Sequence, residues 1–162
     1  MKSSPDRIML AVIFLLSFIS ASTAQSQDMP SAHVMVTPTD LKWADAPPSL
    51  PRGAKMVIME GELSKPGPFT FRLKFPDNYK VPAHSHPAIE HVTVLSGTLI
   101  IGMGDKLAPE KGKELQAGGF IVIPPKTHHF VAGTKGETIV QIHGVGPWGI
   151  TYVNPADDPR KK

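Results

Sequence analysis

The stretch PAHSHPAIEHVTVLSG, residues 82–97, combines three histidines and a glutamate with an alternating apolar run. His84 and His86 are two positions apart, so on a β-strand both imidazoles leave the same face and can approach one ion. Glu90 shares their parity, although Pro87 disfavours a regular strand between them. His91 has the opposite parity, and we expect it to point away. The stretch therefore indicates a candidate metal site on a β-strand.

The sequence on either side of this stretch is typical of short β-strands. In FTFRLKF, residues 69–75, apolar and polar side chains alternate, which predicts a half-buried strand. The 17 prolines and 14 glycines divide the chain into short elements, which favours an antiparallel sandwich or barrel over a helical bundle. The other expected strands cover residues 54–62, 91–96, 98–103, 120–125, 127–132, 137–144 and 148–153.

Turns are expected between several of these strands. Ser96 and Gly97 predict a hairpin between residues 91–96 and 98–103, and GTKG at 133–136 predicts a turn between two later strands. Residues 104–119 are predicted to form a polar connection.

A second group of histidines follows in IVIPPKTHHF, residues 121–130. A buried strand ends in Pro124 and Pro125, and His128 and His129 begin the next strand. Neighbouring residues on a strand face opposite ways, so only one of the two histidines can join a given site. The spacing alone leaves both open.

Together the two histidine stretches resemble the paired motifs of the cupin family, G-x5-H-x-H-x3/4-E-x6-G and G-x5-P-x-G-x2-H-x3-N. The matching residues are His84, His86, Glu90 and Gly97 in the first motif and Gly118, Pro124 and His129 in the second.

The chain departs from the cupin motifs at three positions. Asn78 stands in place of the first glycine, Lys126 in place of the turn glycine, and Gly133 in place of the asparagine. The lysine puts the geometry of the turn from 124 to 129 in question, since lysine tolerates positive φ less well than glycine.

The resemblance implies an all-β, single-domain cupin, a double-stranded β-helix or jelly-roll barrel, over residues 55–153. It also implies that His84, His86, Glu90 and His129 are the metal ligands and that His128 is not. The implied cofactor is one divalent transition metal. Iron, manganese, zinc, nickel and copper all suit three imidazoles and one carboxylate, and the donor set does not choose among them.

The leading functional expectation is a metal-dependent enzyme, an oxygenase acting on a small organic molecule; an isomerase or lyase of the cupin type is the other enzymatic interpretation. The alternative is a non-catalytic cupin that binds or senses a small molecule or a metal. Gln141 and His143 share one face of their strand. They would lie near the metal if that face lines the barrel, or outside it if Val140 and Ile142 point inward.

The first 24 residues predict a secretory signal peptide. Lys2 and Arg7 precede an apolar run at 8–18, and the small residues SASTA follow, with cleavage expected after Ala24. The run is about a dozen residues, short of the roughly 20 that span a bilayer. We therefore expect an exported, periplasmic protein with no membrane span after cleavage. The flanking segments PPSLPRG and GPWGITYVNPADDP resemble those of small exported bacterial single-domain cupins. The expected mature chain has an N-terminal extension at 25–54 and a C-terminal tail at 154–162.

Composition and the absence of certain motifs exclude several other functions. The chain has no cysteine, which excludes thiol chemistry and disulfides. Its net charge is +3 and its basic cluster is the terminal RKK, too small a patch for a nucleic-acid surface. It also lacks the phosphate-binding and nucleophile-elbow motifs. A homodimer is implied by the family resemblance alone.

Overall fold

The computed structural model describes residues 33–162, which form strands and short 3-10 helices with no α-helix among them. This confirms the all-β prediction. The strands are β1 (Ala44–Asp45), β2 (Lys55–Glu60), β3 (Gly67–Phe75), β4 (Val81–Ser85), β5 (Glu90–Met103), β6 (Lys113–Gln116), β7 (Phe120–Ile123), β8 (His129–Gly146) and β9 (Thr151–Tyr152). The 3-10 helices are η1 (Pro38–Asp40), η2 (Pro109–Lys111), η3 (Pro155–Asp157) and η4 (Pro159–Lys161).

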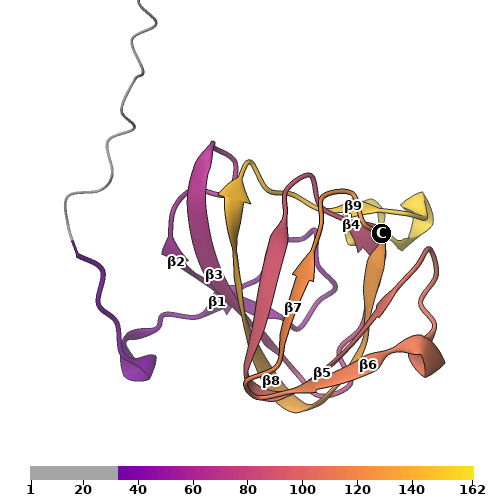
Figure 1. Cartoon of the computed structure of the whole chain (residues 1–162), viewed down its shortest axis with the longest axis horizontal. Coiled ribbons are helices and arrows are strands. Elements are labelled where there is room, and N and C mark those ends of the chain that lie inside the picture. Colours follow the sequence, from indigo (N-terminus) through magenta and orange to yellow (C-terminus); the bar gives the residue numbers. More distant parts are fainter. Residues whose placement is uncertain (1–32) are drawn as a thin grey trace, which may run out of the picture. The chain divides into compact units, whose positions relative to one another are not determined.

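Two long strands, β5 and β8, organise the sheet. They pair with each other along most of their length, and every pairing in the sheet is antiparallel. Along its other edge β8 pairs first with β4 and then with β3, while β5 pairs first with β7 and then with β6. The sheet therefore curls into two layers around a shared interior (Figure 1). This arrangement is the predicted jelly-roll barrel.

The predicted hairpin at Ser96–Gly97 and the predicted turn at 133–136 are both wrong. Each lies inside a continuous strand, β5 or β8. Gly97 has φ +73° and Gly136 has φ +68°, and the β5–β8 register shifts around Ser96. The glycines therefore mark bulges that bend two paired strands from one layer to the other, instead of reversing the chain. The expected polar connection at 104–119 also contains β6, which pairs with the second half of β5.

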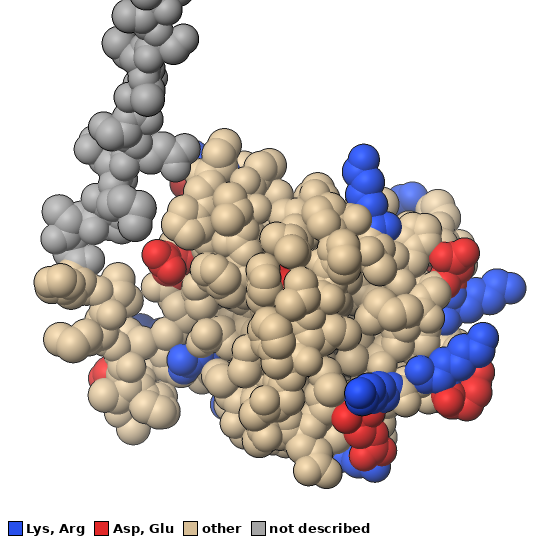
Figure 2. Space-filling model, viewed as in Figure 1, with Lys and Arg blue, Asp and Glu red and all other residues tan. Residues whose placement is uncertain are grey.

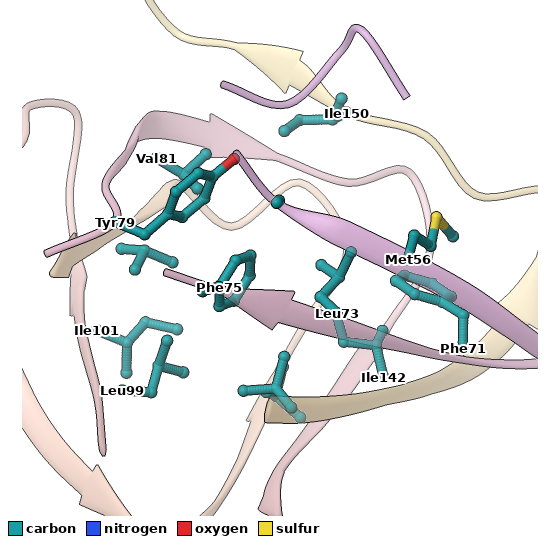
Figure 3. Packing of buried hydrophobic residues seen from close by; sticks show 14 of the residues in the cluster. Met56, Phe71, Leu73, Phe75, Tyr79, Val81, Leu99, Ile101, Ile142 and Ile150 are labelled. Atoms are coloured by element: carbon teal, nitrogen blue, oxygen red, sulfur yellow. The ribbon is translucent and has the colours of Figure 1, made fainter. Parts of the chain in front are cut away.

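Alternation along β3 supplies much of the core, as the sequence predicts. Phe69, Phe71, Leu73 and Phe75 are at most 4% exposed, and the intervening Thr70, Arg72 and Lys74 are half-buried. Side chains from β2, β3, β4, β5 and β8 converge on this row (Figure 3). Hydrophobic burial of this kind is the dominant favourable contribution to folding.

Part of the expected N-terminal extension belongs to the folded domain. β1 pairs with β2, and Leu50 packs against the core. Two tyrosine hydroxyls hold the backbone of this segment: Tyr152 donates to the Ser49 carbonyl at 2.8 Å, and Tyr79 donates to the Pro51 carbonyl. The segment at 44–53 is therefore fastened to the barrel.

Two sequence predictions concern residues that the structure does not describe. The predicted signal peptide and residues 25–32 of the expected extension lie outside the described residues. Within 33–162, no helix has the length and apolar character that a membrane crossing requires.

On the face shown in Figure 2, charged side chains of both signs lie mainly toward the edges of the domain, and its middle is largely uncharged.

Candidate metal centre

Four sequence-predicted residues converge inside the barrel. His84 lies on β4 directly opposite His129 on β8, His86 follows the end of β4, and Glu90 is the first residue of β5. All four are between 2% and 5% exposed. The bend at 86–89 interrupts the strand, as Pro87 predicts, yet Glu90 still reaches the histidines.

Each imidazole is oriented by a backbone carbonyl. The Nδ1 atoms of His84, His86 and His129 lie 2.7, 2.6 and 3.0 Å from the carbonyl oxygens of Pro82, Gly149 and Thr127. Because a carbonyl oxygen only accepts, each Nδ1 carries the hydrogen and donates it. Each Nε2 is therefore left with a free lone pair, which is how histidine ligands are prepared for a metal.

The free nitrogens face one another and a carboxylate. One ring nitrogen from each of His84, His86 and His129 lies within 4.8 Å of the other two. The Glu90 Oε2 atom lies 3.5 Å from Nε2 of His86 and 3.4 Å from Nε2 of His129. With Nδ1 as the donor, these contacts bring lone pairs together without a hydrogen between them. A cation would relieve this repulsion, so the residues fit the metal that the family implies.

Burial favours the neutral form of two of the imidazoles, which is the form that binds a metal. Loss of solvent, with the neighbouring His129 and His86 imidazoles, lowers the pKa of His84 well below its ordinary value. Burial also lowers the pKa of His86, against the opposing effect of Glu90. Both imidazoles are therefore neutral at neutral pH.

The turn before His129 adopts the glycine conformation despite its lysine. Lys126 has φ +62°, and the Thr127 amide donates to the Pro124 carbonyl at 3.2 Å, as in a turn with positive φ at its third residue. The Lys126 amide donates to the His86 carbonyl at 2.8 Å. The turn thus connects the backbones next to two of the histidines. Asn78, at the other replaced glycine, has φ +56°, which asparagine tolerates well.

Trp148 contributes to the site in a way that the sequence did not reveal. Its ring stacks on His86, with centroids 4.5 Å apart and an interplanar angle of 16°. The indole Nε1 is buried without a hydrogen-bond partner in the described structure. The spacing of Trp148 from the histidines along the sequence carries no signal of this contact.

The cluster lines a small cavity whose remaining wall is apolar. About 40 Å³ of it is open to the centres of water-sized molecules, which is room for roughly three waters. The apolar wall comes from both layers of the barrel and from the N-terminal segment: Leu50, Leu73, Phe75, Val81, Val92, Leu99, Ile101, Val131, Val140, Ile142, Trp148 and Ile150.

Gln141 and His143 do not line this cavity, so of the two orientations that the sequence left open the structure has the outward one. They lie on the outer face of β8, because Val140 and Ile142 point into the core. Gln141 Oε1 accepts a hydrogen bond from Arg72, and the His143 ring contacts Thr70 Oγ1 at 3.0 Å. Parity had identified the two possible faces, and burial selects between them.

The other two histidines near the motifs also lie outside the cluster. His91 packs beside Phe120 on the outer face, with ring centroids 6.2 Å apart. His128 is exposed and contacts Asp105 at 2.6 Å. Both placements agree with the sequence predictions.

Comparison with known proteins gives a family match and several structural neighbours. Residues 71–143 match a family model described as a cupin domain. No curated protein matches the sequence significantly.

Among solved structures, the polyketide cyclase RemF from Streptomyces resistomycificus is similar with a TM-score of 0.65 and 18% identity, over 80% of this chain and 92% of that one. The DMSP lyase DddQ from Ruegeria pomeroyi DSS-3 is similar with a TM-score of 0.56 and 15% identity, over 70% of this chain and 61% of that one. A variant of salicylate 1,2-dioxygenase from Pseudoaminobacter salicylatoxidans has a TM-score of 0.50 and 10% identity, over 61% of this chain and 30% of that one.

These neighbours share the fold of this chain while their names describe three different activities, so the fold alone does not assign a reaction. The family match spans all four residues of the histidine–glutamate cluster. Together with the curled antiparallel barrel, it identifies the protein as a member of the cupin superfamily.

Proposed function

We propose that the protein binds one divalent transition metal through His84, His86, Glu90 and His129 and is a metal-dependent enzyme acting on a small molecule. The observation that carries this proposal is the commitment of all three Nδ1 hydrogens to backbone carbonyls. It leaves three lone pairs and a carboxylate in one buried place. Purely structural histidines do not require that arrangement.

Oxygenase chemistry suits the cavity better than isomerase or lyase chemistry. A bound ion would supply open coordination positions and, if it is iron or copper, the ability to activate dioxygen. The chain's own contribution is to hold the ligand nitrogens in place and to surround them with an apolar wall. The described lining offers no titratable group outside the four proposed ligands, whereas side-chain proton transfer needs an acid or base within reach.

A second candidate function is supported by the size of the cavity. With room for roughly three waters, the site could serve a non-catalytic cupin that binds a metal or senses a very small ligand. This interpretation requires the same four ligands, but the binding protein would not convert a substrate to product.

Oxygen consumption distinguishes the two candidates. The purified protein would be loaded separately with iron(II), manganese(II), copper(II), nickel(II) or zinc(II) and supplied with a panel of small organic molecules. Oxygen uptake with iron or copper that disappears in His86→Ala supports the enzyme. Full metal occupancy without uptake or product in any form would favour the binding protein.

The N-terminal sequence supports a further proposal, that the protein is exported to the bacterial periplasm after cleavage behind Ala24. Mass spectrometry of protein recovered from a bacterial periplasm should give a chain that begins at Gln25. A recovered chain that retains Lys2 and Arg7 would contradict export by this route. The homodimer implied by the family stays a proposal that sedimentation would test.

A further inference from the structure

Two side chains stand apart from the rest of the cavity wall. Leu50 and Trp148 are half-buried, whereas the other residues that line the cavity are buried, with exposed fractions of 9% or less. Among the residues that line the cavity, these two are therefore the most accessible to solvent. Leu50 comes from the segment before β2, and Trp148 lies between β8 and β9.

Both residues are held in place. The backbone around Leu50 receives the Tyr152 and Tyr79 hydroxyls, and the Leu50 amide donates to the Pro47 carbonyl at 2.9 Å. Trp148 is fixed by its backbone hydrogen bond to the Leu63 carbonyl at 2.7 Å and by stacking on His86. The backbone of both residues is therefore anchored.

The interior behind this pair limits both the size and the charge of a ligand. The free space holds roughly three water-sized groups within a wall that is apolar apart from His84, His86, Glu90 and His129. Within residues 33–162, no lysine or arginine lines the cavity. A charged group on a ligand would therefore be buried without a partner unless it bound the metal itself, and such burial is costly.

We propose that Leu50 and Trp148 form a size-selecting mouth that admits to the metal site only compact molecules of about three non-hydrogen atoms with no charge beyond the atom that binds the metal. The inference deepens the proposed function and rests on it for the metal. Dioxygen and similarly small ligands belong to this class. Aromatic rings and polycarboxylates do not.

Ligand binding to the cobalt(II)-loaded protein tests the mouth, with the visible spectrum as the readout. Azide should bind to the wild type, whereas imidazole, which is larger, should bind poorly. Leu50→Ala should strengthen imidazole binding by about tenfold or more and leave azide binding nearly unchanged. Leu115→Ala is the matched control, because Leu115 is also half-buried against the core but does not line the cavity.

A metal-free measurement separates failure of the mouth from failure of the metal site. Diethyl pyrocarbonate modifies unprotonated imidazoles, and peptide mapping reports each histidine separately. In the metal-free wild type His84, His86 and His129 should be protected while exposed His128 reacts, and Leu50→Ala should raise modification of the three by about tenfold. Leu115→Ala should leave them protected.

The outcomes are distinguishable. If cobalt does not bind but Leu50→Ala still raises modification of the three histidines, the result contradicts the proposed metal site and supports the proposed mouth. The mouth is overturned if wild type and Leu50→Ala bind imidazole equally well, or if the reagent modifies the cluster in the wild type as fast as it modifies His128.

Discussion

At the scale of single residues, the backbone at Lys126 links the two halves of the site. Its φ of +62° lies in the left-handed region that favours glycine, and its amide holds the His86 carbonyl. The cupin motif has glycine here, so the sequence raised the question of whether a lysine could form the same turn. The structure answers that it does, with backbone strain at this position.

Lys126→Gly should therefore raise the free energy of unfolding, by about 0.5–1 kcal/mol, because relief of the left-handed strain exceeds the added entropy of the unfolded chain. Denaturant titration measures the change. Lys106→Gly is the control, since Lys106 is exposed and has no positive φ, and it should lower stability slightly. Equal losses in both variants would contradict strain at Lys126.

The two tyrosines that fasten the N-terminal segment are the only tyrosines in the chain, which makes them measurable. Burial, followed by the charge of Tyr152, raises the pKa of Tyr79, and burial, followed by Asp158, raises the pKa of Tyr152. The folded state thus disfavours tyrosinate. The stabilisation is complete below about pH 10, the value in unfolded chains, and is lost as the pH rises above it.

In a spectrophotometric titration of the folded protein, tyrosinate absorbance should appear only above the pH at which it appears in guanidinium-unfolded protein. Unfolding itself should become easier over the same alkaline range. A normal titration curve for either tyrosine in the folded state would mean that its hydroxyl is not buried against the 44–53 segment.

At the scale of elements, the bend in β5 and β8 closes the barrel around the site. A Cβ at Gly97 would lie 2.5 Å from the Glu137 carbonyl oxygen and from Thr138 Oγ1, because the paired strands approach closely there. At Gly136, which has a similar φ, a Cβ would meet nothing within 4 Å. The two glycines therefore separate backbone strain from steric overlap.

We expect Gly136→Ala to cost about 1 kcal/mol of stability from strain alone, and Gly97→Ala to cost about 2–4 kcal/mol from strain and overlap together. Thermal or denaturant unfolding of both variants measures the difference. Similar small losses at the two positions would show that the strands do not approach at Gly97 as described.

The bend also explains which elements could be predicted from the sequence. Alternation fixed the inner face of β3 correctly because its whole length is half-buried in one layer. Glycine next to a polar residue is equally typical of a hairpin turn and of a bulge. Local sequence could not decide between them at Gly97 and Gly136, because the outcome depends on pairing between strands far apart in the chain.

At the scale of the whole molecule, the candidate site combines parts that the sequence located and parts that only the fold brings together. The resemblance to the cupin motifs implied His84, His86, Glu90 and His129, and all four converge. The Trp148 stack, the place of Leu50 in the cavity wall and the outward face of Gln141 and His143 depend on tertiary packing, for which one sequence has no local signal.

The central claim is that the four-residue cluster binds one metal ion, and equilibrium dialysis with zinc, which is redox-inert, tests it most directly. His128→Ala is the matched control beside His129→Ala, because His128 is exposed and outside the cluster, and thermal unfolding checks that both variants fold. We predict one tightly bound zinc per chain in the wild type and in His128→Ala, and binding at least about a hundredfold weaker in His129→Ala. Unchanged zinc stoichiometry and affinity in a folded His129→Ala protein would contradict the account.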